Sequence, residues 1–173
     1  MLTVTKPIAS FCAGDLMSRD MTMVSGQMTL QGAARLLSRA QVNGAPVVDG
    51  DGRLVGVLSA VDFLHWAENG GVATPPSCAC GDTAWKPWQM LDQPEHAATM
   101  VSDVMNRNPV TTPQRTGLIE LSRMMVDAHI HRIIVVDHDD KPVGIVTSTD
   151  ILAALARSDL GHELQEHTHH ATV

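Results

Sequence analysis

The sequence predicts an α+β fold in which two pseudo-twofold β-α-β-β-α repeats pack together as a pair. One pattern of apolar residues, turn residues and charges occurs twice along the chain at a fixed spacing. In each copy, two short apolar runs flank an acidic turn, which is typical of a β-hairpin. Apolar residues at helical spacing stand before and after that hairpin. Because a single copy would leave one sheet face uncovered, the two copies are expected to pack on each other.

The fixed spacing identifies the repeat. Subtracting 62 from 150, the numbers of two matching aspartates, gives an offset of 88 residues. This offset aligns the copies without a gap and pairs identical or similar residues along their length: Asp15 with Asp103, Met17 with Met105, Arg19 with Arg107, Leu30 with Leu118, Asp49 with Asp137, Gly56 with Gly144 and Leu64 with Leu152.

The first copy predicts two helices around a hairpin. Leu30, Ala33, Ala34 and Leu37 recur at helical spacing, which predicts an amphipathic helix over residues 29–40. The other elements expected in this copy are strands at 46–48 and 54–58, joined by an acidic turn, and a helix from 59–62 to about residue 68.

The second copy predicts the same elements. Its first helix is expected over residues 118–128. Apolar runs at 133–136 and 143–146 flank a turn that contains Asp139 and Asp140. A second helix is expected to open at residues 147–150.

These elements divide the chain into five segments. We expect an N-terminal segment at 1–12, a first repeat at 13–70, an inserted linker at 71–100, a second repeat at 101–158 and a His-rich tail at 159–173. The linker carries Cys78, Cys80, Trp85 and Trp88. A connection of this length with little period of its own is either mobile or functional.

Composition excludes several classes of protein. A formal net charge of −7 and a pI near 5.6 argue against nucleic-acid binding through the overall field. No apolar run approaches the roughly 20 residues of a membrane span. The N-terminus lacks the order of a signal peptide, and three cysteines form no pattern of a secreted disulfide framework. A cytoplasmic, reducing setting is therefore expected.

A hydroxyl and a carboxylate recur where each hairpin leads into a helix. They stand as Ser59 and Asp62 in the first copy and as Thr147 and Asp150 in the second. Beside the backbone N–H groups of a helix N-terminus, such a pair makes a small polar site. The same spacing is close to a capping box, in which both groups only cap the helix. A ligand site and a cap can coexist at one position.

At these residues the chain resembles a tandem pair of CBS domains, named for the regulatory region of cystathionine β-synthase. The strongest signature is Gly56-Val-Leu-Ser59-Ala-Val-Asp62, repeated as Gly144-Ile-Val-Thr147-Ser-Thr-Asp150. Supporting features, in matching order, are Asp15-Leu-Met17, Asp103-Val-Met105, Asn108-Pro-Val-Thr-Thr112 and His131-Arg-Ile-Ile-Val-Val-Asp137.

The resemblance implies a regulatory module, not an enzyme, that binds AMP, ADP, ATP or S-adenosylmethionine in clefts between the repeats. It implies no cofactor, a homodimer and signalling to an effector protein whose identity is unknown. A carboxylate accepts from ribose hydroxyls, whereas hydroxyl and guanidinium groups suit phosphate. The nucleotide-binding residues implied by the resemblance are Asp150, Thr147, Arg132, Ile133, Thr111 and Thr112 in the second copy, and Asp62, Ser59, Val24, Ala45 and Pro46 in the first.

The two implied sites are unequal. The second copy has His131 and Arg132 before its hairpin, where the first copy has Asn43 and Gly44. We therefore expect tighter nucleotide binding at the site of Thr147 and Asp150.

Two other functions compete with this one. Cys78, Cys80 and the His-rich tail would make a metal- or redox-responsive interaction module, although a closed Zn²⁺ site needs four ligands and no such set is evident. Because that ligand set is missing, no metal site is predicted. The third function is a small nucleotide hydrolase built on the carboxylates, but no nucleophile–base pair stands out.

Overall fold

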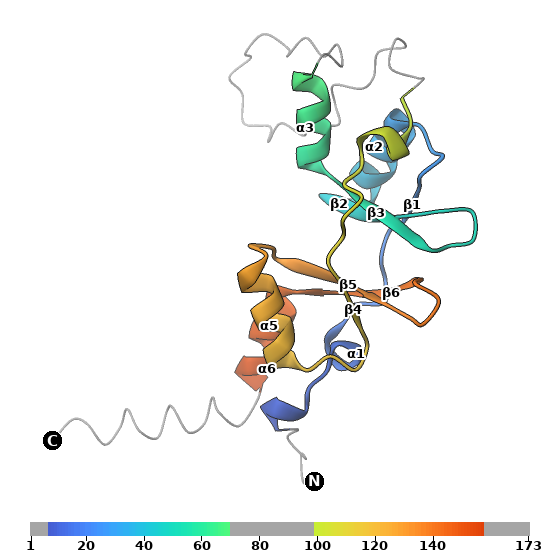
Figure 1. Ribbon diagram of the computed structural model, residues 1–173. Helices are drawn as coiled ribbons and strands as arrows, with labels where there is room; N and C mark the ends of the chain where they lie inside the picture. The colour runs from blue at the N-terminus through green and yellow to red at the C-terminus, as the bar shows by residue number, and fades with distance from the viewer. Residues whose placement is uncertain (1–6, 70–98, 158–173) are drawn as a thin grey trace, which may run out of the picture. The chain divides into compact units, whose positions relative to one another are not determined.

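The structure is a computed structural model that describes residues 7–69 and 99–157. The chain divides into two compact units. We call residues 1–21 with 110–173 unit 1, and residues 22–109 unit 2. Each unit contains a small sheet with helices packed on it (Figure 1).

Unit 2 contains a three-stranded sheet in the order β1-β2-β3, in which β1 is parallel to β2 and β2 is antiparallel to β3. Its described elements are β1 (Val24–Ser25), α2 (Leu30–Ala40), β2 (Gly44–Val48), β3 (Leu54–Ser59), α3 (Ala60–Glu68) and α4 (Val101–Val104).

Unit 1 repeats this arrangement with a sheet in the order β4-β5-β6. Its described elements are the 3-10 turn η1 (Ile8–Ser10), α1 (Ala13–Leu16), β4 (Thr111–Pro113), α5 (Leu118–Asp127), β5 (Arg132–Val136), β6 (Pro142–Thr147) and α6 (Ser148–Arg157). The α+β class and the predicted β-α-β-β-α order are confirmed in both copies.

Each sheet buries one face under its helices. In unit 2, Leu30 and Leu37 of α2 pack with Val47 and Leu58 of the sheet, and all four are fully buried. In unit 1 the corresponding core contains Leu121 of α5 with Ile133, Val135 and Val146 of β5 and β6. These cores are mainly aliphatic, as the low aromatic content of 3% requires.

The segment at the start of each repeat packs with the other repeat's sheet. Ser18 exchanges two backbone hydrogen bonds with Ile145 of β6, at 2.9 and 3.0 Å. Asn106 makes the same pair with Val57 of β3, at 2.9 and 3.0 Å. We call residues 12–19 and 100–107 the leading segments. Each adds one residue pair to the open edge of a sheet, so the compact units do not coincide with the repeats read from the sequence.

The glycines of the repeated signature allow this edge contact. A Cβ added to Gly144 would lie 2.5 Å from Met17 Sδ, and one added to Gly56 would lie 2.7 Å from the Asn106 carbonyl oxygen. Real Cβ atoms essentially never approach so closely. Glycine is therefore required at both positions for the leading segment to lie against the strand.

Candidate functional site

The hydroxyl–carboxylate pairs form reciprocal caps at the N-termini of α3 and α6. In unit 1, Asp150 Oδ2 accepts hydrogen bonds from Thr147 N (2.7 Å) and Thr147 Oγ1 (2.6 Å), and Asp150 N donates to Thr147 Oγ1 at 3.3 Å. In unit 2, Asp62 Oδ2 accepts from Ser59 N (2.7 Å) and Ser59 Oγ (2.6 Å). The capping role considered from the sequence is therefore present in both copies.

Capping uses only part of each carboxylate. Both recorded bonds reach Oδ2, and no donor within residues 7–69 and 99–157 is recorded on Oδ1 of Asp62 or Asp150. Both side chains are partly exposed. An ionised carboxylate can accept at each oxygen, so each cap retains acceptor capacity for a ligand hydroxyl.

The loop before each hairpin is tied to the same helix N-terminus. Ser148 N donates to the His131 carbonyl oxygen at 3.0 Å, and Ala60 N donates to the Asn43 carbonyl oxygen at 3.0 Å. This bond places the start of β5 beside the start of α6. It explains why residues far apart in the sequence, Arg132 and Thr147, meet at one end of the sheet.

Strand register decides which predicted residues share a face. We call the sheet face opposite the helices the site face. In unit 1, Arg132 is the cross-strand partner of Thr147, and Thr111 is the partner of Ile134. Since side chains alternate along a strand, Arg132, Ile134, Thr111 and Thr147 lie on the site face.

Two predicted residues of unit 1 lie on the helix-packed face. Ile133 is fully buried in the core cluster. Thr112 is 3% exposed, and its Oγ1 donates to Thr116 Oγ1 at 2.7 Å. Their side chains pack into the core beneath the site face.

Unit 2 shows the same division. Gly44 is the partner of Ser59, and Pro46 is the partner of Val57, so this row lies on the site face. Val24 and Ala45 instead belong to the core cluster under the helices. Only Ser59 and Asp62 bring polar side chains to the predicted set in this unit.

Arg132 gives the unit 1 site a positive charge. Its side chain is exposed, and no ion pair or hydrogen bond to a described residue is recorded for it. Directly opposed cross-strand residues have Cβ atoms roughly 4.5–5.5 Å apart, so the guanidinium and the Thr147 hydroxyl can reach one ligand group. A guanidinium beside a hydroxyl at a helix N-terminus favours an anion such as phosphate.

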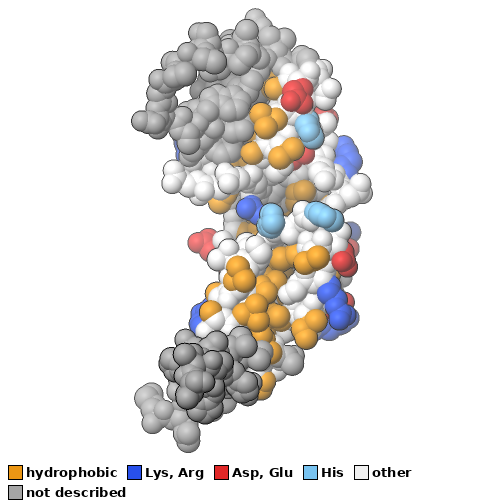
Figure 2. Space-filling view, turned by 90° about the vertical axis from the view of Figure 1, so that its left-hand side faces the viewer, with side chains coloured by type: hydrophobic (Ala, Val, Ile, Leu, Met, Phe, Trp, Pro, Cys, Tyr) orange, Lys and Arg blue, Asp and Glu red, His pale blue; other side chains and the backbone are white. Residues whose placement is uncertain are grey.

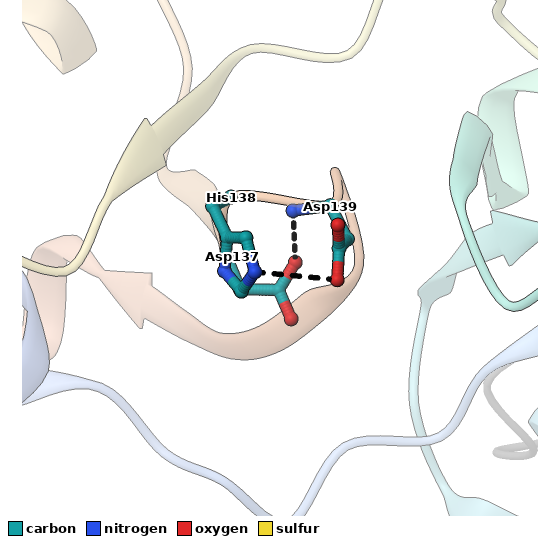
Figure 3. A group of neighbouring side chains, drawn as sticks. All are labelled: Asp137, His138 and Asp139. Atoms are coloured by element: carbon teal, nitrogen blue, oxygen red, sulfur yellow. Dashed lines mark hydrogen bonds and ion pairs between the residues drawn. The ribbon is translucent and has the colours of Figure 1, made fainter.

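The turn between β5 and β6 contains a group of side chains with metal-binding chemistry, Asp137, His138 and Asp139 (Figure 3). Asp137 Oδ1 accepts from the backbone N–H groups of Asp139 and Lys141, both at 2.9 Å. The Lys141 bond is the main cause that lowers the pKa of Asp137 from 3.8. His138 Nε2 lies 3.4 Å from Asp139 Oδ2. Asp49 makes the same bonds in the first hairpin, so these groups are accounted for by turn formation.

Sequence reasoning did not anticipate the leading segments as part of the site. Ser18 opposes Ile145 and therefore joins the row of the unit 1 site face that contains Ile134 and Thr111. The sequence feature that could have indicated this is the methionine repeated at Met17 and Met105. In the structure these side chains lie against Gly144 and Gly56 of the signature. Cys78, Cys80 and the His-rich tail, on which the metal and redox alternative depends, lie outside the described residues.

The comparison with known proteins supports the resemblance. The CBS domain family model matches residues 13–69 and 101–157. CBSX1, a chloroplastic CBS domain-containing protein of Arabidopsis thaliana, is 27% identical over 150 residues, which are 83% of this chain and 64% of CBSX1. The chain thus spans just under two thirds of that relative's length.

Solved structures agree with the fold. A crystal structure of CBSX2 in complex with AMP has a TM-score of 0.63 and 26% identity, covering 84% of this chain and 96% of CBSX2 as solved. The CBS domain pair of MJ0100 has a TM-score of 0.61 at 22% identity, covering 84% of this chain and 95% of that chain, and supports the fold alone. Among the helices of residues 7–69 and 99–157, none has the length and apolar character needed to cross a bilayer.

Proposed function

Since the chain belongs to the CBS domain family, we propose that it is a regulatory module that binds an adenine nucleotide, with its principal site in unit 1. The observation that carries the proposal is the placement of Arg132 opposite Thr147, with Asp150 in the first turn of the following helix. The crystal structure of the relative CBSX2 with AMP supports the choice of ligand.

In the proposed contacts, the carboxylate binds the neutral ribose, and the guanidinium and hydroxyl bind the anionic phosphate. Oδ1 of Asp150 accepts from the ribose hydroxyls while Oδ2 continues to cap α6. Arg132 and the Thr147 hydroxyl bind phosphate oxygens, because a charge-assisted bond is about twice as strong as a neutral one. Thr111 and Ile134 form the floor beside them, and the buried Ile133 and Thr112 hold that floor in place from below.

Calorimetric titration of the purified protein with AMP, ADP, ATP and S-adenosylmethionine tests this site. We expect micromolar binding of at least one nucleotide, lost in Asp150→Ala and retained in Asp127→Ala, which removes an exposed acid at the end of α5. Loss of binding in Asp62→Ala with full retention in Asp150→Ala would refute unit 1 as the principal site. Turnover of the nucleotide during the titration would refute the regulatory, non-catalytic assignment.

We also propose that the module acts as a homodimer and signals to an effector protein. Hydrophobic side chains gather over α5 and α6 (Figure 2). Four of them are exposed: Ile119 and Val126 on α5, and Leu152 and Leu155 on α6. At the offset of 88, α2 carries Gln31 and Ser38 where α5 carries Ile119 and Val126. An exposed apolar surface of this kind is typical of a protein interface.

The mass of the protein in solution tests the dimer. Light scattering after size-exclusion chromatography should give twice the monomer mass of 18.6 kDa. Val126→Asp combined with Leu152→Asp should shift the mass to that of a monomer. Ser38→Asp combined with Ala67→Asp, on the corresponding helices α2 and α3 of unit 2, should leave it unchanged, and equal effects of the two pairs would reject the α5–α6 surface.

A further inference from the structure

We infer that the two sites take ligands of different charge. The Thr147–Asp150 site of unit 1 binds a phosphorylated adenine nucleotide, whereas the Ser59–Asp62 site of unit 2 binds an adenosine-type ligand without a phosphate. The inference rests on the proposed function, because it assigns a ligand class to each of those two sites.

The difference begins at one pair of matching positions. The cross-strand partner of Thr147 is Arg132, and the cross-strand partner of Ser59 is Gly44. The hydroxyl and the capped carboxylate are the same in both units, with Oδ2 bonds of 2.6 and 2.7 Å in each. The ribose-binding half is thus shared, and the cation that would neutralise a phosphate is present in unit 1 alone at this position.

The backbone of unit 2 closes that position to any side chain. A Cβ placed on Gly44 would lie 2.8 Å from the Leu58 carbonyl oxygen and 3.2 Å from Ser59 Cα. Backbone atoms cannot rotate away as a flexible side chain does. The absence of a cationic side chain at position 44, opposite Ser59, is therefore built into the local path of β2 and β3.

The other arginines described in unit 2 lie elsewhere. Arg53 lies in the turn at the far end of the β2–β3 hairpin, where its N–H donates to Asp49. Arg107 is held by its Nη2, which donates to the Ser102 carbonyl oxygen at 2.6 Å. Arg35 and Arg39 belong to α2, whose buried side chains pack on the opposite face of the sheet.

The site face of unit 2 is also less polar. At the offset of 88, Met23 matches Thr111, and the Met23 side chain is 44% exposed. The buried Pro46 matches Ile134 in the adjacent strand. An exposed thioether beside a proline favours the apolar and aromatic parts of an adenosine-type ligand. Bringing a phosphate to this face would desolvate its charge without a compensating cation from the described strands of unit 2.

Titration of single-site variants with AMP and with adenosine tests the assignment. Asp62→Ala leaves the unit 1 site, which should bind AMP at least about tenfold more tightly than adenosine, as expected for a hydrogen bond to a charged group. Asp150→Ala leaves the unit 2 site, which should bind adenosine at least as tightly as AMP. Asp150→Asn and thermal melts check that lost binding is not lost folding.

The role of Arg132 is tested in the Asp62→Ala background. Adding Arg132→Ala should abolish the preference for AMP while adenosine affinity stays within about threefold. Adding Arg123→Ala, which removes an exposed arginine from α5 of the same unit, should change neither. Equal AMP-to-adenosine ratios at the two sites, or no binding at all by folded Asp150→Ala, would overturn the inference. Failure of the unsubstituted protein to bind either ligand would instead overturn the proposed function, and this inference with it.

Discussion

The carboxylate of Asp150 serves two roles, because it caps α6 and is also the proposed contact for a ligand hydroxyl. With the caps formed, Oδ2 is occupied by two short bonds, and Oδ1 is the atom that would meet a ligand. The Ser/Thr-x-x-Asp spacing predicts both roles equally well, because a cap and a ribose contact need the same residues at the same helix position. Strand register, which the sequence alone does not specify, places Arg132 opposite Thr147. A cap does not need this cation, whereas a phosphate ligand does, so the position of Arg132 distinguishes the ligand-binding role from the capping role.

Gly144 is a position at which one methyl group should disturb the sheet edge. Gly144→Ala would place its Cβ against Met17 Sδ, and overpacking of this kind costs about 1–3 kcal/mol. Gly50→Ala, which has no neighbour within 4 Å and no positive φ, should be nearly neutral. Urea unfolding measures both free energies. Equal effects of the two substitutions would contradict the Met17 contact.

Asp137 should make the stability of the protein depend on acid pH. Its pKa is lowered in the folded state, chiefly by the Lys141 N–H bond, from an unfolded value near 3.8. The charged carboxylate therefore contributes stability above pH 3.8, and that contribution is lost as pH falls through the lower folded pKa. Asp137→Asn keeps the acceptor oxygen and removes the charge. Its deficit in unfolding free energy at pH 6 should shrink toward pH 3, and a deficit independent of pH would contradict this account.

Among the secondary-structure elements, long periodic ones were predictable and short ones were not. The helix expected over residues 29–40 is α2 (Leu30–Ala40), and that expected over 118–128 is α5 (Leu118–Asp127). The four-residue helices α1 and α4 carry too few turns for an amphipathic period to show. The predicted binding set mixed both faces of the strands, since Ile133 and Thr112 follow the site-face residues directly in sequence.

The end of α2 offers a stabilising substitution. Gln41 caps this helix in the left-handed region, with φ of 56°. That conformation costs a residue with a side chain roughly 1–2 kcal/mol and costs glycine little. Gln41→Gly should therefore raise the unfolding free energy by about 0.5–1 kcal/mol. Ala40→Gly, one residue earlier in the last helical turn, should lower it by a similar amount. Thermal melts measure both, and a loss of stability in Gln41→Gly would contradict the cap geometry.

At the scale of the whole molecule, each leading segment packs, within one compact unit, with the sheet of the other repeat. The contact of Met17 with Gly144 is separated by 127 positions in the sequence, so no local pattern predicts it. What the sequence does contain is its consequence, a glycine in each signature and a methionine near the start of each repeat. Hence the repeat in the sequence was enough to identify the family, but it did not predict which leading segment pairs with which sheet.

Hydrogen exchange tests this pairing. Met17→Ala removes a side chain that is 8% exposed and belongs to the unit 1 core, and such truncations cost about 2–5 kcal/mol. Although Met17 belongs to the first repeat in the sequence, protection should fall first in β5 and β6 of the second. Met105→Ala should do the reverse and affect β2 and β3. A loss of protection in β2 and β3 on Met17→Ala would contradict the exchanged packing.

A two-dimensional amide NMR titration with AMP tests the central claim most directly, because it reports the position of the nucleotide as well as its affinity. The amides of Arg132, Thr147 and Asp150 should show the largest shifts and saturate together. Those of the hairpin turn at Asp137 should move little. Shifts confined to other parts of the chain, or no saturable shift at any amide, would contradict a nucleotide site on this face of unit 1.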